Sequence, residues 1–148
     1  MPLVNHLVPD CVRFLSASNK AEAIKELLDC LAGRYALPNR DEIAAALRHR
    51  EDLMSTGIGL GIAVPHVRLA AVPLPMVAVG IHHAGIVDYE SLDGKPVHVI
   101  VMILAGKGQH EQYIQLLADV TRTLRNEKTR HKILASVDAA EVHALLLA

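Results

Sequence analysis

Residues 55–69 read STGIGLGIAVPHVRL, and this stretch decides how the rest of the chain is interpreted. Glycines at positions 57, 59 and 61 alternate with other residues, and an apolar, strand-like run then leads to Pro65 and His66. Glycine-rich backbone of this kind can bring its N–H groups close to an anion. The stretch is therefore a candidate for a nucleotide-binding loop, a metal site or a scaffold that holds one reactive imidazole.

The glycine spacing argues against a nucleotide-binding loop. A dinucleotide-binding GxGxxG pattern that starts at Gly57 needs a glycine at position 62, which is Ile62, and Pro65 interrupts the helix that should follow. A P-loop ends in Gly-Lys-Ser/Thr, whereas residues 105–110 read AGKGQH. We therefore expect neither loop, and no cofactor.

The histidines and carboxylates do not follow a metal-ligand spacing either. His82 and His83 are adjacent, so on a strand they would point to opposite faces. Asp88, Glu90 and Asp93 fall in a turn region without a recognisable ligand rhythm, and the chain has no HExxH pattern. We expect no specific metal site.

A reactive histidine is the remaining possibility. Proline fixes φ and cannot donate to a sheet ladder, so Pro65 would end a strand at an edge or a bend. His66 would then emerge at the end of that strand, where α/β proteins place ligands. Arg50, Ser55 and Thr56 supply guanidinium and hydroxyl donors near this histidine. Such donors stabilise the negative charge of a phosphoryl group that an imidazole nitrogen accepts. From spacing alone, the alternative of a structural histidine stays open.

The composition indicates one globular domain and excludes several classes of partner. The chain has 148 residues, of which 51% are hydrophobic, enough to bury a substantial core. The formal net charge of −1 provides no global field for nucleic acid or anionic membrane. Cys11 and Cys30 lack the CxxC spacing, and neither a secretion signal nor an apolar run of roughly 20 residues is visible. We expect a cytoplasmic protein without membrane insertion or a nucleic-acid partner.

Hydrophobic periodicity predicts helices before and after a central group of strands. Asn19 and Asn39, each with a glutamate three residues later, resemble helix caps, and Gly33 is expected to end the first helix. Ser136 or Asp138 would cap the last helix. Strands are expected within 11–17, 75–81 and 97–104, and helices within 19–33, 39–52, 110–126, 128–136 and 138–148. This order implies a single α/β domain over residues 1–148, with helices covering the sheet.

Residues 50–66, REDLMSTGIGLGIAVPH, resemble a family signature without a gap. The signature, RExLxSTGxGxGIAxPH, is that of the enzyme IIA domains of the fructose/mannitol class in the bacterial phosphotransferase system, including the nitrogen-regulatory branch. Residues 87–105 and 114–146 also resemble segments of that family, so the similarity covers nearly the whole chain. The resemblance implies a mixed sheet flanked by α-helices on both faces.

The resemblance also implies a function and its partners. His66 would accept a phosphoryl group from the phosphohistidine carrier HPr, or a paralogue, and pass it to a cysteine of a IIB domain during sugar uptake. Such a chain is a phosphotransferase with a phosphohistidine intermediate. Regulatory members of the family instead bind a transporter or a kinase according to their phosphorylation state. By position, Arg50 would stabilise the phosphate, with Ser55 and Thr56 near it.

The chain departs from the family pattern at two places. Val67 follows the Pro-His pair, where the family usually has a small residue, so its branched side chain would narrow access to His66 or change the loop. The family often has a second histidine near the active one, and this alignment puts Tyr113 there. His110 lies three residues earlier on the same helical face, so His110 or Tyr113 would supply the second phosphate contact. Core packing is the alternative for Tyr113.

Overall fold

Two runs rich in valine and isoleucine form the centre of the sheet, as predicted. In the computed structural model, which describes residues 2–148, these runs are β5 (Met76–Ile86) and β6 (Val97–Ala105), and they pair antiparallel. Most of their residues are buried, because helices cover both faces of the sheet. β5 is longer than the predicted 75–81, since the chain stays extended through His82 and His83.

Four shorter strands complete a six-stranded mixed sheet. The order is β1-β5-β6-β3-β2, and β4 pairs with the end of β6. β1 is parallel to β5, β3 and β4 are parallel to β6, and β2 is antiparallel to β3. The short strands are β1 (Val12–Phe14), β2 (Gly57–Gly59), β3 (Ile62–Ala63) and β4 (His66–Arg68). The predicted α/β class with a mixed sheet is confirmed, although the first strand is shorter than expected.

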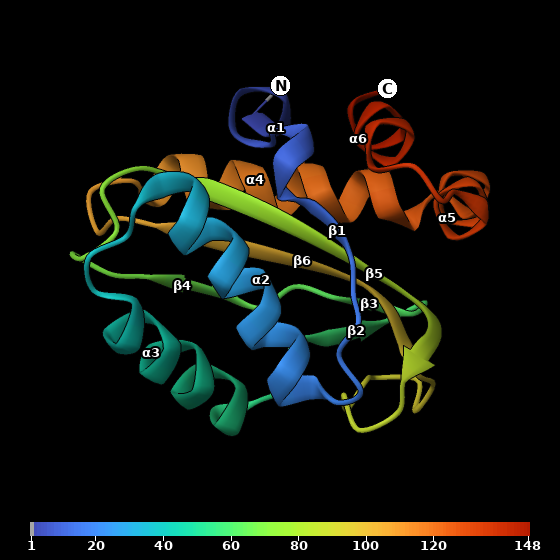
Figure 1. The fold of residues 1–148 in the computed structure, drawn as a ribbon, viewed down its shortest axis with the longest axis horizontal. Coiled ribbons are helices and arrows are strands. Elements are labelled where there is room, and N and C mark those ends of the chain that lie inside the picture. The colour runs from blue at the N-terminus through green and yellow to red at the C-terminus, as the bar shows by residue number, and fades with distance from the viewer. Residues whose placement is uncertain (1) are drawn as a thin grey trace.

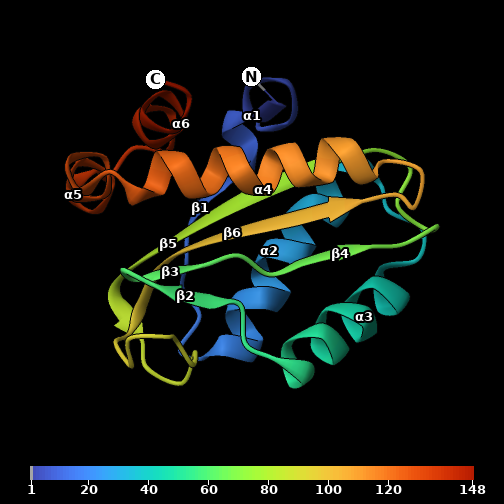
Figure 2. The same ribbon diagram turned by 180° about the vertical axis from the view of Figure 1, so that it is seen from behind.

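The helices lie in two layers, one on each face of the sheet (Figure 1). α2 (Lys20–Tyr35) and α3 (Arg40–Leu53) cover one face. Figure 2 shows the other layer, in which α4 (His110–Arg125) runs along β6. That layer also holds α1 (Pro2–His6), α5 (Glu127–Ala135) and α6 (Ala139–Leu147), and the one-turn helix η1 (Pro9–Cys11) leads into β1. No helix among residues 2–148 combines the length and the apolar character needed to cross a bilayer.

The helix N-termini follow the predicted caps in part. The Asn19 side chain accepts a hydrogen bond from the N–H three residues on, as expected of a cap. Asp138, rather than Ser136, caps α6, because its carboxylate accepts the N–H of Ala140. Asn39 occupies the cap position of α3 as predicted, but its side chain makes no capping hydrogen bond. The predicted position is therefore right and the predicted side-chain cap is wrong.

The end of α2 also differs from the prediction. The helix continues through Gly33 and stops at Ala36, which adopts the left-handed conformation with a φ of 51°. This conformation reverses the chain after the last turn in the way that glycine usually does. The position of a glycine near the expected end was therefore a misleading stop signal.

Candidate functional site

His66 lies just after a break between β3 and β4, two short strands that both pair with β6. β3 pairs Ala63 with Ile100 of β6, and β4 pairs His66 with Ile103, so the register continues across Val64 and Pro65. As predicted, a strand ends just before Pro65, whose missing N–H is tolerated at an edge. His66 itself begins a new short strand, which the sequence analysis did not predict. The imidazole is therefore held on the sheet rather than on a free loop.

The imidazole of His66 is held in one tautomer. Its Nδ1 lies 2.5 Å from the Val64 carbonyl oxygen, which can only accept, so Nδ1 carries the proton. Burial lowers the pKa of His66, and the positive charge of Arg50 lowers it further, against opposing effects of the Val64 hydrogen bond and Glu51. His66 is thus a neutral imidazole at neutral pH, with the lone pair on Nε2.

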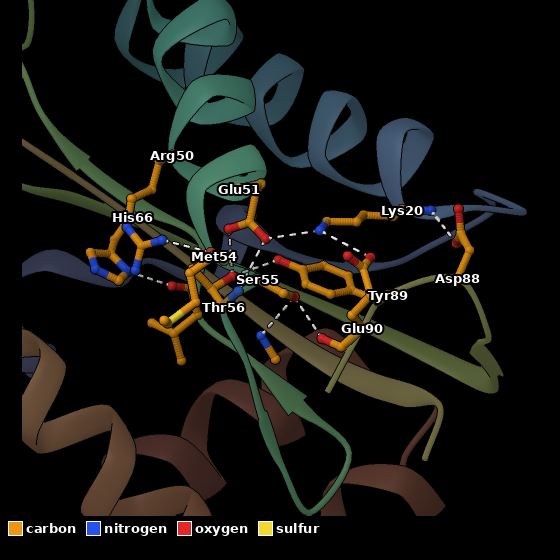
Figure 3. A network of polar contacts seen from close by, with 12 residues as sticks. Lys20, Arg50, Glu51, Met54, Ser55, Thr56, His66, Asp88, Tyr89 and Glu90 are labelled. Carbon is orange, nitrogen blue, oxygen red and sulfur yellow. Dashed lines mark hydrogen bonds and ion pairs between the residues drawn. The ribbon is translucent and has the colours of Figure 1, made fainter. Parts of the chain in front are cut away.

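Three further side chains lie around this imidazole. The Tyr113 ring of α4 lies 5.5 Å from the His66 ring, centroid to centroid, and the Arg68 guanidinium lies 5.7 Å from the Tyr113 ring. Arg50 comes from the last turn of α3, and its Nη1 donates to the Met54 carbonyl at 2.7 Å. Figure 3 shows the Arg50 side chain beside His66. Two guanidinium groups and one phenol therefore surround a half-buried, neutral histidine.

Burial raises the pKa of the Tyr113 hydroxyl, and the charges of Arg50 and Arg68 act in the opposite direction. The phenol therefore stays protonated at neutral pH, while both guanidinium groups are close enough to act on it. A protonated phenol hydroxyl is a hydrogen-bond donor that can serve an anion. Arg68 lies two residues after His66 on the same strand, which places the two side chains on the same face.

The two hydroxyls expected near the phosphate have partners elsewhere. The Ser55 hydroxyl donates to the Glu90 carbonyl at 2.6 Å, and the buried Thr56 hydroxyl lies 2.6 Å from a Glu51 carboxylate oxygen. The Tyr89 hydroxyl lies 2.8 Å from the same Thr56 oxygen, which therefore accepts from Tyr89 while donating to Glu51. The structure thus brings Arg50 and Tyr113 together with His66, but directs Ser55 and Thr56 into a neighbouring network.

The centre of that network is the buried carboxylate of Glu51. It accepts the backbone N–H of Thr56 at 3.1 Å and pairs with the Lys20 ammonium at 3.1 Å. Lys20 also lies 4.6 Å from the centre of the Tyr89 ring. Figure 3 shows this chain of contacts running from Lys20 to the segment that carries Arg50 and His66. The sequence analysis gave Glu51 no role, although its place directly after Arg50 in the signature was a usable signal.

The glycines of the opening stretch serve the backbone rather than an anion. A Cβ on Gly57 would lie 2.2 Å from the Glu90 carbonyl oxygen, so only glycine lets segment 90–93 approach this closely. Gly59 has a φ of 92°, which the turn between β2 and β3 requires, and its N–H donates to Ser91. The N–H groups of Gly57 and Gly59 donate to the hydroxyls of Ser55 and Ser91, so in this structure their partners lie within the chain.

His110 and Val67 occupy quite different environments. His110 is the first residue of α4, exposed, one helical turn before Tyr113, and its side chain makes no hydrogen bond to another residue of the described chain. Val67 is buried and pairs with Leu104 of β6, on the opposite face of β4 from His66. The expected narrowing of access by Val67 is wrong, because alternate strand residues point to opposite sides.

The adjacent histidines bind backbone carbonyls. His82 Nε2 lies 2.8 Å from the Ala17 oxygen, and His83 Nε2 lies 3.2 Å from the Ser136 oxygen. The two rings therefore point to separate parts of the chain. Over residues 2–148, no group of three or more histidine, cysteine, aspartate or glutamate side chains is arranged to hold a metal ion.

Comparison with known proteins identifies the family to which the chain belongs. Residues 5–148 match the family model described as "Phosphoenolpyruvate-dependent sugar phosphotransferase system, EIIA 2". The protein is thus a phosphotransferase-system component. It belongs to the EIIA 2 family, as the resemblance of residues 50–66 implied.

Three relatives illustrate the range of this family. A fructose-specific EIIA component of Haloferax volcanii is 34% identical over 87% of this chain and 83% of its own length. A nitrogen regulatory protein of Bradyrhizobium diazoefficiens is 29% identical over 99% of this chain and 95% of its own length. A fructose-specific EIIABC component of Bacillus subtilis is 37% identical over 81% of this chain, but the match spans only 19% of that longer protein.

Solved structures support the same fold. The nitrogen regulatory protein IIA-Ntr from Neisseria meningitidis superimposes with a TM-score of 0.88, covering 96% of this chain and 97% of that one at 24% identity. Enzyme IIA for mannitol from Escherichia coli, solved in complex with phosphorylated enzyme IIB, gives a TM-score of 0.79 over 95% and 96% of the two chains at 24% identity. At this identity the likeness establishes the fold.

Proposed function

We propose that this protein is a phosphocarrier that accepts a phosphoryl group on His66 Nε2 from a phosphohistidine carrier of the HPr type. The observation that carries the proposal is the tautomer of His66. Nδ1 is held by the Val64 carbonyl at 2.5 Å, so the reactive lone pair is left on Nε2. Neutral imidazole is the form that attacks phosphorus, and the lowered pKa of His66 keeps it neutral.

The transfer step balances around this one nitrogen. The Nε2 lone pair forms a bond to phosphorus while the bond from phosphorus to the donor's imidazole nitrogen breaks, and the donor ring keeps that electron pair. His66 retains its Nδ1 proton, so its ring gains positive charge as the phosphoryl group arrives. The Val64 carbonyl stabilises that charge, since it accepts the Nδ1–H hydrogen bond.

The side chains around His66 supply positive charge and hydrogen-bond donors to the phosphoryl group. The phosphoryl group carries negative charge on three equatorial oxygens, and Arg50 is close enough to His66 to affect its pKa. Within this proposal Arg50 stabilises those oxygens, and the Tyr113 hydroxyl or His110 donates a further hydrogen bond. Ser55 and Thr56 act at one remove, by fixing segment 54–57 below Arg50.

The proposed acceptor is the cysteine of a IIB domain that takes part in sugar uptake. The relative from Bacillus subtilis is named as a fructose-specific EIIABC component, and the Escherichia coli neighbour was solved with phosphorylated enzyme IIB. The exposed Leu53 and Met54 side chains beside Arg50 offer an apolar contact area for such a partner. We further propose that the protein acts in the cytoplasm, where these phosphocarriers meet.

A regulatory function is the second candidate. The match to the nitrogen regulatory protein covers 99% of this chain, more than the match to either fructose-specific relative. In that function, phosphorylation of His66 adds charge beside Arg50 and changes binding to a transporter or a kinase. Phosphoryl transfer to His66 is common to both candidates.

Intact-mass measurement tests the phosphocarrier. Incubation with HPr, its phosphorylating enzyme and phosphoenolpyruvate should add one acid-labile group of about 80 Da. His66→Ala should abolish the addition, while His83→Gln, a change at a histidine bound to the Ser136 carbonyl, should leave it intact. No addition to the wild-type protein, or labelling of His66→Ala, would overturn the proposal.

Two further measurements separate the candidates. Mixing the phosphorylated protein with a IIB domain should transfer the phosphoryl group to the IIB cysteine if the chain serves sugar uptake. A regulatory protein should instead retain the group and bind a transporter or kinase differently in its two phosphorylation states. Retention of the phosphoryl group together with state-dependent binding would favour the regulatory function over phosphoryl transfer for sugar uptake.

A further inference from the structure

The two cysteines of the chain lie against each other on the side of the molecule formed by η1 and α2. Cys11 ends η1 and is completely buried, while Cys30 lies in α2 with 9% of its surface exposed. The Cys30 sulfur lies 3.5 Å from the carbonyl oxygen of Asp10, the residue directly before Cys11, and each cysteine acts on the pKa of the other. Both thiols are free. Their separation in the sequence gives no sign that η1 and α2 bring them together.

The surroundings of the two sulfurs differ. The Arg13 Nε donates to the Cys30 sulfur at 3.4 Å, whereas the Asp10 carbonyl lies 3.5 Å from it and favours the protonated thiol. The hydrogen bonds from Cys11 and Arg13 lower the pKa of Cys30 to about 6, against the opposing effect of burial. The contact with Cys30 and burial raise the pKa of Cys11. Cys30 is therefore the more acidic of the two thiols, and Cys11 the less acidic.

Cys30 is reached from outside through a surface hollow. This hollow has a volume of about 470 Å³ and is lined by Cys30, Arg13, Arg34 and Asp29, among others. Cys11 does not line it. A small reagent that enters the hollow therefore meets Cys30, whereas Cys11 is buried and is not exposed to the hollow.

We propose that Cys30 and Cys11 form a hydroperoxide-sensitive thiol pair, in which Cys30 reacts first and Cys11 resolves the product as an intramolecular disulfide. The Cys30 thiolate attacks the terminal peroxide oxygen, the O–O bond breaks, and the alkoxide or hydroxide that leaves takes a proton from water. The sulfenic acid on Cys30 then reacts with the Cys11 thiol, which forms the S–S bond and releases water. Two thiols are oxidised by two electrons, and one hydroperoxide is reduced.

The site is independent of the phosphoryl-transfer site. It is built from η1, β1 and α2, while His66 and Arg50 lie on β4 and α3. The proposal therefore stands or fails without regard to the phosphocarrier function, and the phosphorylation assay and the oxidation assay report on different residues.

Mass spectrometry of the folded wild-type chain tests the proposal directly. One equivalent of hydrogen peroxide should lower the intact mass by about 2 Da, and dithiothreitol should reverse the change. Peptide mapping should then find Cys11 joined to Cys30 of the same chain. No loss of mass, a disulfide between two chains, or a stable sulfonic acid on Cys30 would overturn the proposal.

Substitutions identify which thiol acts first. In Cys11→Ser the sulfenic acid has no resolving thiol, so peroxide should add about 16 Da that a sulfenic-acid reagent traps at Cys30. Cys30→Ser should not react with one equivalent of peroxide. Trapping at Cys11 in the Cys30→Ser chain would contradict the assigned order.

The alkylation profile of the wild-type chain needs no cysteine variant. The rate of Cys30 alkylation should reach half its maximum near pH 6, against about 8.5 for an ordinary cysteine thiol. Arg13→Gln should move this midpoint upward, because it removes the Nε donor. Arg34→Gln, a matched change in the same hollow, should move it less, since Arg34 acts on Cys11. A wild-type midpoint at the ordinary value would contradict the proposal.

Discussion

The Tyr113 ring packs against the His66 ring at 5.5 Å between centroids, with the two planes tilted by 54°. His66 lies on an edge strand and Tyr113 on α4, so this contact supports the imidazole from a different element. Tyr113 also occupies the position at which the family resemblance places a second histidine. The structure thus favours Tyr113 over His110 as the neighbour of the reactive ring, because the Tyr113 ring packs against the imidazole.

Tyr113→Phe tests whether the hydroxyl takes part in phosphoryl transfer. The ring and its packing are kept, so the free energy of unfolding should change by less than about 1 kcal/mol. Transfer to His66 should slow about 5-fold, since one donor near the phosphoryl oxygens is lost. Rapid-quench measurement of phosphorylation checks this result. His110→Gln is the matched change, and a larger effect from it than from Tyr113→Phe would assign the second contact to His110.

Arg50→Gln tests the electrostatic role of the guanidinium. Phosphorylation of His66 should slow by about 100-fold, because the charge that builds on the phosphoryl oxygens loses its nearest cation. Arg48→Gln, an exposed change two residues earlier on α3, should leave the rate within about twofold. An equal rate for both variants would remove Arg50 from the site.

The pH dependence of His66 provides a separate prediction. Burial and Arg50 lower the pKa of His66 below 6.5, so wild-type His66 should remain neutral and reactive somewhat below that pH. Arg50→Gln removes one cause, so the pKa should rise and the loss of activity on acidification should begin at a higher pH. NMR titration of the His66 ring in the wild type and in Arg50→Gln checks the sign. A fall of the His66 pKa in Arg50→Gln would contradict the electrostatic explanation.

Glu51→Ala tests the buried network behind the site. It leaves the Thr56 N–H without its partner and the Lys20 ammonium with only the exposed carboxylate of Glu90, so the chain should lose about 3 kcal/mol of stability. Glu90→Ala removes the second and mostly exposed partner of Lys20, 3.5 Å away, and should cost less than about 1 kcal/mol. Urea denaturation followed by circular dichroism measures both. Similar losses of stability in the two variants would show that the contacts of buried Glu51 stabilise the chain no more than the exposed contact of Glu90.

The large apolar elements could be predicted from the sequence because their patterns are long. The runs at 75–81 and 97–104 and the helical stripe that includes Tyr113 fall in β5, β6 and α4. The strands β2, β3 and β4 have only two or three residues, too few for a periodic signal. β3 and β4 form because β6 offers hydrogen-bonding partners, and β2 pairs in turn with β3. Local signals such as Gly33 were overridden by the packing of α2.

The chemistry of the site was harder to predict than its location. The signature gave His66 and Arg50, but the roles of Ser55 and Thr56 depend on Glu51, Tyr89 and Glu90, which reach them across the fold. Contacts over more than thirty residues of sequence, such as Ser55 with Glu90, leave no trace in local spacing. The sequence therefore suggested that the Ser55 and Thr56 hydroxyls bind phosphate. In the structure they bind a backbone carbonyl and a carboxylate instead.

Val67→Gly tests the one residue of the opening stretch that departs from the family pattern. Val67 is buried opposite His66, so its removal should cost about 3 kcal/mol of stability through lost burial and added backbone freedom. The phosphorylation rate of the folded protein should change by less than about twofold, because the side chain does not face the imidazole. The stability of Val67→Ala should lie between those of the wild type and Val67→Gly, and its phosphorylation rate should match that of the wild type. Faster phosphorylation of Val67→Gly without loss of stability would mean that the branched side chain restricts access to His66 after all.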